Sequence, residues 1–127
     1  MNVFAVASRL LLVLSLWLPA SAGAAAVDTA TRTEIAGLMQ ALEQSGCRFQ
    51  RNGTWYAAGQ ARSHLQRKYD YLLKRDLVTS PERFIALAAS RSSMTGRPYK
   101  VACDGHAEQD AASWFTAQLQ QLRRARD

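Results

Sequence analysis

The sequence lacks the short motifs that mark several large enzyme classes. It contains no Walker-type phosphate loop, no dinucleotide-binding Gly-x-Gly-x-x-Gly and no Gly-x-Ser-x-Gly nucleophile elbow. Metal ligands are scarce as well, because the only two histidines, His64 and His106, lie 42 residues apart, and a zinc site needs about three or four ligands. We therefore expect no cofactor and no metal ion.

Long apolar segments are missing after the amino terminus. The apolar run at residues 10–18 is interrupted by Ser15 and is far shorter than the roughly 20 residues of a bilayer span. Pro19 and a tract of small residues follow it, which is the layout of a secretory signal peptide cleaved after Ala22 or Ala24. We therefore expect residues 1–24 to be a signal peptide. Residues 25–127 would form a single domain that does not span a membrane, in the periplasm or secreted.

Cysteine occurs only twice, at Cys47 and Cys103, so one pairing exists. An exported protein meets an oxidising compartment, which favours a disulfide. Two free thiols, or a metal held by the pair, are the alternatives. Closing so long a loop would contribute about 4 kcal/mol to the free energy of unfolding in the chain-entropy model. That is a large share of the total of roughly 5–15 kcal/mol that is usual for a domain.

Acidic residues are outnumbered by basic ones, with 10 against 16 in the whole chain and a net charge of +6. The basic residues are spread along the chain, which is typical of a basic surface without a partner. If a partner exists, an exported protein would meet an unknown protein or an anionic envelope component, not nucleic acid. The aromatic pairs Trp55-Tyr56 and Trp114-Phe115 are interpreted as core residues and not as a stacking platform for bases.

Helical and strand patterns alternate along the rest of the chain. Apolar residues recurring every three or four positions predict four helices, which cover residues 31–45, 58–74, 79–90 and 110–124. Asn52-Gly53 is a strong hairpin signal between strands at 47–51 and 54–56, and a third strand covers 99–103. These elements predict an α+β fold in which a three-stranded antiparallel sheet packs with about four helices and carries one disulfide. We expect a monomer.

Capping signals place the helix starts. Thr31 and Glu34 have the spacing of a capping box at the first helix. At the third helix, either Thr79 forms such a box with Glu82, or Ser80 caps a helix with proline in its first turn. Asp110 is the predicted cap of the last helix.

Several short segments recur in a characteristic order and spacing: Cys47-Arg48-Phe49, Arg51-Asn52-Gly53, Ser63-His64-Leu65, Lys68-Tyr69, Thr79 to Ile85, Ala89-Ser90, Ser92-Ser93, Thr95-Gly96, Pro98-Tyr99, Val101 and Trp114. Taken together, they resemble the YfeK-like family of small exported proteobacterial proteins, a domain of unknown function. The resemblance covers about residues 31–122 and implies an exported single-domain protein. It brings no activity, substrate or catalytic residue with it.

A polar face on the second predicted helix offers the first candidate chemistry. His64, Lys68 and Tyr71 recur at one helical face, next to the apolar stripe. If the following Ser92–Tyr99 loop packs over this face, His64 could activate Ser92 or Ser93 as a nucleophile. This gives a small hydrolase as one hypothesis, although no acid is placed to orient the histidine.

The hypothesis we favour from sequence is a binding protein of the periplasm or cell envelope without catalytic residues. A loop rich in serine, threonine, glycine and proline, held by a disulfide-linked strand, can contact a partner at low ordering cost. One form of this hypothesis is an inhibitor of a cell-wall enzyme acting through the Ser92–Tyr99 loop. The candidate binding residues are His64, Lys68, Ser92, Ser93, Thr95, Arg97 and Tyr99. The alternative is that the loop only ends a helix and leads into a strand.

Overall fold

The computed structural model describes residues 14–18 and 27–127. Both predicted cleavage sites lie outside these ranges, as does the predicted signal peptide except for residues 14–18. Residues 14–18 form neither helix nor strand. Within the described ranges, no helix combines the length and the apolar character that crossing a bilayer requires.

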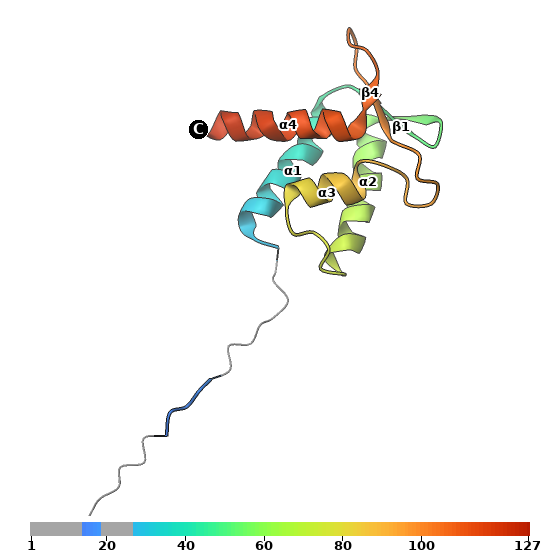
Figure 1. Cartoon of the computed structure of the whole chain (residues 1–127). Helices are drawn as coiled ribbons and strands as arrows, with labels where there is room; N and C mark the ends of the chain where they lie inside the picture. Colours follow the sequence, from blue (N-terminus) through green and yellow to red (C-terminus); the bar gives the residue numbers. More distant parts are fainter. Residues whose placement is uncertain (1–13, 19–26) are drawn as a thin grey trace, which may run out of the picture.

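Residues 27–127 form four helices and four short strands, which confirms the predicted α+β class (Figure 1). In chain order they are α1 (Thr29–Gln44), β1 (Arg48–Arg51), β2 (Thr54–Ala57), α2 (Ala58–Leu73), α3 (Pro81–Ala88), β3 (Lys100–Ala102), β4 (Gln109–Asp110) and α4 (Ala111–Arg126). The prediction of three strands was wrong, because β4 is a fourth. It has two exposed polar residues, and so short a segment carries no alternation of apolar and polar residues.

The sheet is antiparallel throughout, with the strand order β2-β1-β3-β4. Phe49 at its centre lies opposite Tyr56 on one side and Val101 on the other. Asn52 and Gly53 have φ values of 49° and 81°, so the hairpin turn is left-handed at both central residues, as predicted. Phe49 and Val101 are buried and face the helices.

The helix starts follow capping chemistry, but not always the predicted residue. Helix α1 begins earlier than expected, because Asp28 Oδ1 accepts the amide hydrogen of Thr31 at 2.7 Å. Thr31 is itself buried within the helix, so the predicted capping box is wrong. Ser80 caps α3 with proline in the first turn, which confirms the second alternative there. Asp110 precedes α4 but makes no capping bond; its carboxylate instead accepts from Lys100.

One core joins the helices to the inner face of the sheet. Its largest fully buried side chains are Tyr99, Phe49, Phe84, Phe115, Ile35, Leu38, Met39, Leu42, Leu65 and Val101. Trp114 and Phe115 belong to this core as predicted. Trp55 and Tyr56 do not, since both are partly exposed; the guanidinium groups of Arg48 and Arg51 lie over their rings.

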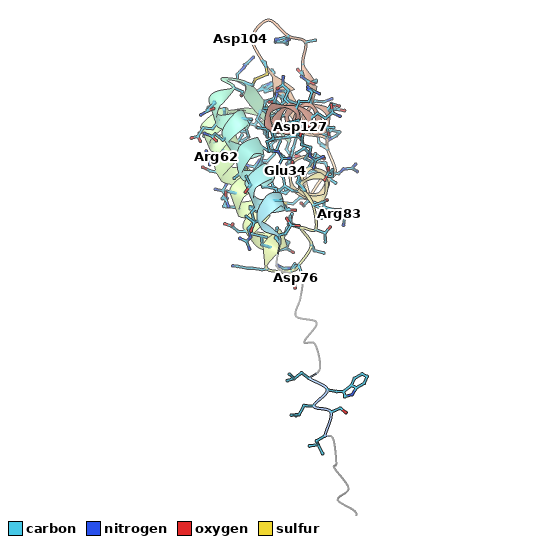
Figure 2. The ribbon with its side chains drawn as sticks, turned by 90° about the vertical axis from the view of Figure 1, so that its left-hand side faces the viewer. Glu34, Arg62, Asp76, Arg83, Asp104 and Asp127 are labelled. Carbon is cyan, nitrogen blue, oxygen red and sulfur yellow. A yellow bond between two sulfur atoms is a disulfide. The ribbon has the colours of Figure 1, made fainter. Side chains whose placement is uncertain are left out.

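Ion pairs fasten α4 to the two helices that it crosses. Arg123 binds the Glu34 carboxylate of α1 through two nitrogens, at 2.8 and 3.2 Å, and reaches Glu82 of α3 at 2.7 Å. Arg126 adds a third contact to Glu34 at 3.0 Å. Figure 2 views this face, with Glu34 near the end of α4 at Asp127. The Arg123 side chain lowers the pKa of the Glu34 carboxyl below its usual value.

The predicted disulfide is present between Cys47 and Cys103, which are 56 residues apart in sequence. Cys47 directly precedes β1 and Cys103 directly follows β3. The bridge therefore closes the end of the β1–β3 ladder, beside the pair formed by Arg48 and Ala102.

Replacing both cysteines with alanine is expected to lower the free energy of unfolding by about 4 kcal/mol. The reason is that the bridge restricts a long loop in the unfolded chain. Urea unfolding of the oxidised protein and of the Cys47→Ala/Cys103→Ala variant measures this difference. A reductant should destabilise the parent and leave the variant unchanged; equal midpoints for all of them would refute the contribution.

Candidate functional site

Helix α2 presents His64 and Lys68 to the buried end of the Ser92–Tyr99 loop. The apolar residues Ala61, Leu65, Tyr69 and Leu72 anchor this helix in the core. The polar face beside them therefore lies at the edge of the core, as the sequence predicted. Tyr71 of the same face is 54% exposed and takes no part in the hydrogen bonds described below.

The Tyr99 hydroxyl is the point at which α2 and the loop meet. Tyr99 is 1% exposed and its ring packs on Phe49 with centroids 5.1 Å apart. Its oxygen lies 3.2 Å from His64 Nε2 and 3.1 Å from Lys68 Nζ. The Lys68 ammonium also donates to the carbonyl of Arg91 at 3.1 Å. The structure thus brings together three of the predicted site residues.

Arg51 completes this arrangement, although it is not among the site residues predicted from the sequence. Its Nη1 lies 3.1 Å from His64 Nδ1, and its Nη2 lies 3.4 Å from the Tyr56 hydroxyl. Arginine has donors only, so Nδ1 of His64 must accept and the ring hydrogen must sit on Nε2, facing Tyr99. The signal was available, because strand alternation from the buried Phe49 points Arg51 inward.

The environment of these side chains disfavours positive charge. Burial, together with Arg51 and the cations of α2, lowers the pKa of His64 from 6.5 to about 4. Burial and Arg51 lower the pKa of Lys68 from 10.5 to about 8. Burial raises the pKa of the Tyr99 hydroxyl. His64 is therefore neutral at pH 7, whereas Lys68 is mostly charged.

The loop before β3 is held in place by Ser92 and by the hairpin turn. The buried Ser92 Oγ accepts from the amides of Met94 and Thr95, each at 3.3 Å, and from Asn52 Nδ2 at 3.3 Å. Thr95 Oγ1 donates to Asn52 Oδ1 at 2.7 Å, and Gly96 takes a φ of 74°. Asn52 thus links the hairpin to the loop, and both project on the same side in Figure 1.

Within the described residues, the side chains of the other two predicted residues make no hydrogen bond in this network. Ser93 and Arg97 are exposed, and the Arg97 guanidinium lies over the hairpin turn at Gly53. Within residues 27–127, the hydrogen bonds of His64 go to Arg51 and Tyr99 and not to Ser92 or Ser93. The structure therefore does not form the serine–histidine pair that the hydrolase hypothesis requires.

Two adjoining pockets flank the polar face of α2. The first has a volume of about 310 Å³ and is lined by Phe49, Arg51, Tyr56, Gln60, Ala61, Ser63, His64 and Arg67. The second has a volume of about 490 Å³ and is lined by Arg51, His64, Arg67, Lys68, Tyr71, Leu72, Leu87 and Ser93. The two pockets share a wall of three basic side chains, so one ligand group at this wall is accessible from both.

We call Arg51, His64, Arg67 and Lys68 the basic cluster. Among the described residues, no carboxylate lines either pocket, and none of the ion pairs includes a member of the cluster. By contrast, Arg62, which lies on α2 like three members of the cluster, forms an ion pair with Glu43. The cluster therefore forms a concave surface whose positive charge has no counter-charge in the described part of the chain.

A model of a family of unknown function, DUF5329, matches residues 29–123. The chain belongs to this family. Searches of curated proteins and of solved structures found no significant match. Membership of DUF5329 supports the coarser part of the resemblance drawn from the sequence, namely a family without an assigned activity whose match covers residues 29–123. The matched range includes every residue of the two pockets.

The free energy of unfolding of this DUF5329 member should fall as the pH decreases from about 6.5 to about 4. In that window the unfolded chain binds a proton at His64 and the folded protein does not. The full shift corresponds to about 3 kcal/mol, and partial exposure reduces the expected effect to about 2 kcal/mol. Urea unfolding at several pH values measures it.

The His64→Gln variant should lose this part of the pH dependence. The matched control is His106→Gln, which changes the exposed second histidine and should keep the slope of the parent. Equal slopes for the parent and His64→Gln would contradict the assignment.

Asn52→Gly keeps a residue that tolerates positive φ but removes the link between hairpin and loop. We expect the amides of Met94 and Thr95 to exchange hydrogen about tenfold faster, since two side-chain hydrogen bonds are lost. Exchange measured by NMR tests this, with the amides of α4 as the internal reference. Unchanged exchange in the loop would show that Asn52 does not hold it.

Proposed function

We propose that the protein is an exported binding domain of the cell envelope, without catalytic activity, whose basic cluster binds an anionic group. One observation carries this proposal: four basic side chains line two adjoining pockets that contain no carboxylate among the described residues. The exported location rests on the predicted signal peptide and on the YfeK-like resemblance.

The donors of the cluster are suited to an anion. Lys68 has three N–H donors and uses two, towards Arg91 and Tyr99. Arg51 has five and uses two, towards His64 and Tyr56, and the Arg67 side chain makes no hydrogen bond to another described residue. Hydrogen bonds from these groups to a carboxylate or phosphate are charge-assisted, which makes them shorter and stronger than neutral ones.

Electrostatics supports the same proposal. The lowered pKa values of His64 and Lys68 reflect burial beside like charge. A bound anion would offset that repulsion and would raise both pKa values. The site therefore gains more from an anion than isolated surface cations would.

A second candidate is contact with a protein partner, including a cell-wall enzyme, through the Ser92–Tyr99 loop. In its favour, the loop is tied down by Ser92 and Asn52, while Met94 at its tip is 94% exposed. The hydrolase hypothesis has less support, because Arg51 occupies the ring nitrogen of His64 that would act as a base.

Arg67→Gln is expected to weaken binding of inorganic phosphate about tenfold or more, since it removes a charge-assisted hydrogen bond of about 1.5–3 kcal/mol. Isothermal titration calorimetry at low salt measures the binding. The matched control is Arg62→Gln, which removes the same charge from the same helix but lies outside both linings. Phosphate binding that is absent in the parent, or that both variants weaken equally, would refute a site at the cluster.

A further inference from the structure

The larger of the two pockets has an apolar wall that a simple inorganic anion does not use. Tyr71 and Leu72 of α2 and Leu87 of α3 line it, together with Arg51, Arg67 and Lys68. Its volume of about 490 Å³ falls within the range of roughly 300–1,000 Å³ that is usual for small-molecule sites. Such sites are typically apolar with a few fixed polar groups, as this one is.

We propose that this pocket binds an anionic amphiphile, a molecule with one carboxylate or phosphate head and an unbranched hydrocarbon tail. The inference rests on the proposed function, because the head occupies the basic cluster. The tail lies along Tyr71, Leu72 and Leu87.

The register of α2 sets the relation of head to tail. Arg67 and Lys68 precede Tyr71 and Leu72 by four residues each, so the cationic and apolar side chains lie about one helical turn, roughly 5.4 Å, apart along one side. Leu87 closes the pocket from α3 and is half-buried against the core. A linear molecule with its head at Lys68 therefore meets apolar side chains within its first few methylene groups.

The burial of these side chains favours a single molecule in the pocket over a membrane surface. Leu72 is 7% exposed and Leu87 is partly buried, so neither can insert into a bilayer. Tyr71 is the one apolar lining residue that is largely exposed, and the Arg75 guanidinium stacks on its ring at 3.7 Å. A tail must enter the pocket to reach Leu72 and Leu87.

The smaller pocket is a poorer fit for such a tail. Gln60 and Ser63 interrupt its wall, and Arg51 lies over the Tyr56 ring. A hydrocarbon there would cover polar groups without satisfying their hydrogen bonds, which is unfavourable. The larger pocket is therefore the one assigned to the tail.

The test is calorimetric titration of the purified protein with straight-chain carboxylates of increasing length, all below their micelle concentrations. Each methylene group that enters the pocket should tighten binding up to about fourfold, until the pocket is full. Straight-chain alcohols of equal length should bind far more weakly, because they lack the charged head.

The outcomes separate this inference from the proposed function. If inorganic phosphate and acetate bind at the cluster but chain length has no effect, the amphiphile inference is overturned and the proposed function stands. If no anion binds, both fail. Alcohols that bind as tightly as the carboxylates would also overturn the inference, since the head would then contribute nothing.

Variants locate the tail. Leu87→Ala should reduce the gain per methylene without changing phosphate binding, whereas Leu73→Ala, a half-buried leucine outside the lining, should leave the gain unchanged. Tyr71→Ala provides a second test at a largely exposed position, where folding is not at risk. If Leu87→Ala and Tyr71→Ala both keep the chain-length dependence of the parent, the tail does not occupy this pocket.

Vesicles distinguish a lipid surface from a free amphiphile. Phosphatidylcholine vesicles with and without phosphatidylglycerol serve as the probe in a sedimentation assay. Binding to the anionic vesicles, with no response to the soluble carboxylates, would overturn the pocket inference in favour of surface attraction. A response to the carboxylates that the Leu87→Ala variant weakens would support it.

Discussion

The buried hydroxyl of Tyr99 is the contact on which the rest of the site depends. Its oxygen accepts from both His64 and Lys68, while its ring packs on Phe49 in the centre of the sheet. Tyr99 directly precedes β3. It thereby connects this strand and the core to the polar face of α2. Because an oxygen has only two lone pairs for such bonds, these two donors saturate it, and both basic side chains are fixed in direction.

Charge in this molecule is distributed in two contrasting ways. On the face where α4 crosses α1 and α3, each arginine that is held has a carboxylate opposite it, as Arg123 has Glu34 and Glu82. Around Tyr99, basic side chains are held by neutral acceptors instead: a phenol, an imidazole and a carbonyl. The first arrangement balances its charge within the fold, whereas the second leaves positive charge without a counter-charge in the described part of the chain.

Much of the fold was predictable because its signals are local. The Asn52-Gly53 turn and the apolar periodicity of α2 each follow from a few neighbouring residues, and two cysteines allow only one bridge. Local sequence signals were not sufficient to choose between two nearby helix caps, Asp28 and Thr31. They also did not predict β4, which is a strand only because it pairs with β3. The site was half predictable for the same reason. The shared face of His64 and Lys68 is a matter of helical spacing, but the position of Arg51 against His64 depends on how the hairpin folds back onto α2.

The cationic part of the site is almost entirely local in the chain. Arg51, His64, Arg67 and Lys68 come from one stretch of eighteen residues, made up of the hairpin turn, β2 and most of α2. Tyr99 joins from more than thirty residues further on. Contacts of short sequence separation form early in folding, and distant ones wait for loop closure. The hairpin and α2 can therefore bring the four basic groups together before Tyr99 arrives, and the Tyr99 hydroxyl then accepts from two of them, His64 and Lys68. Formation of β3, which Tyr99 directly precedes, is consequently coupled to the hydrogen bonds that fix His64 and Lys68.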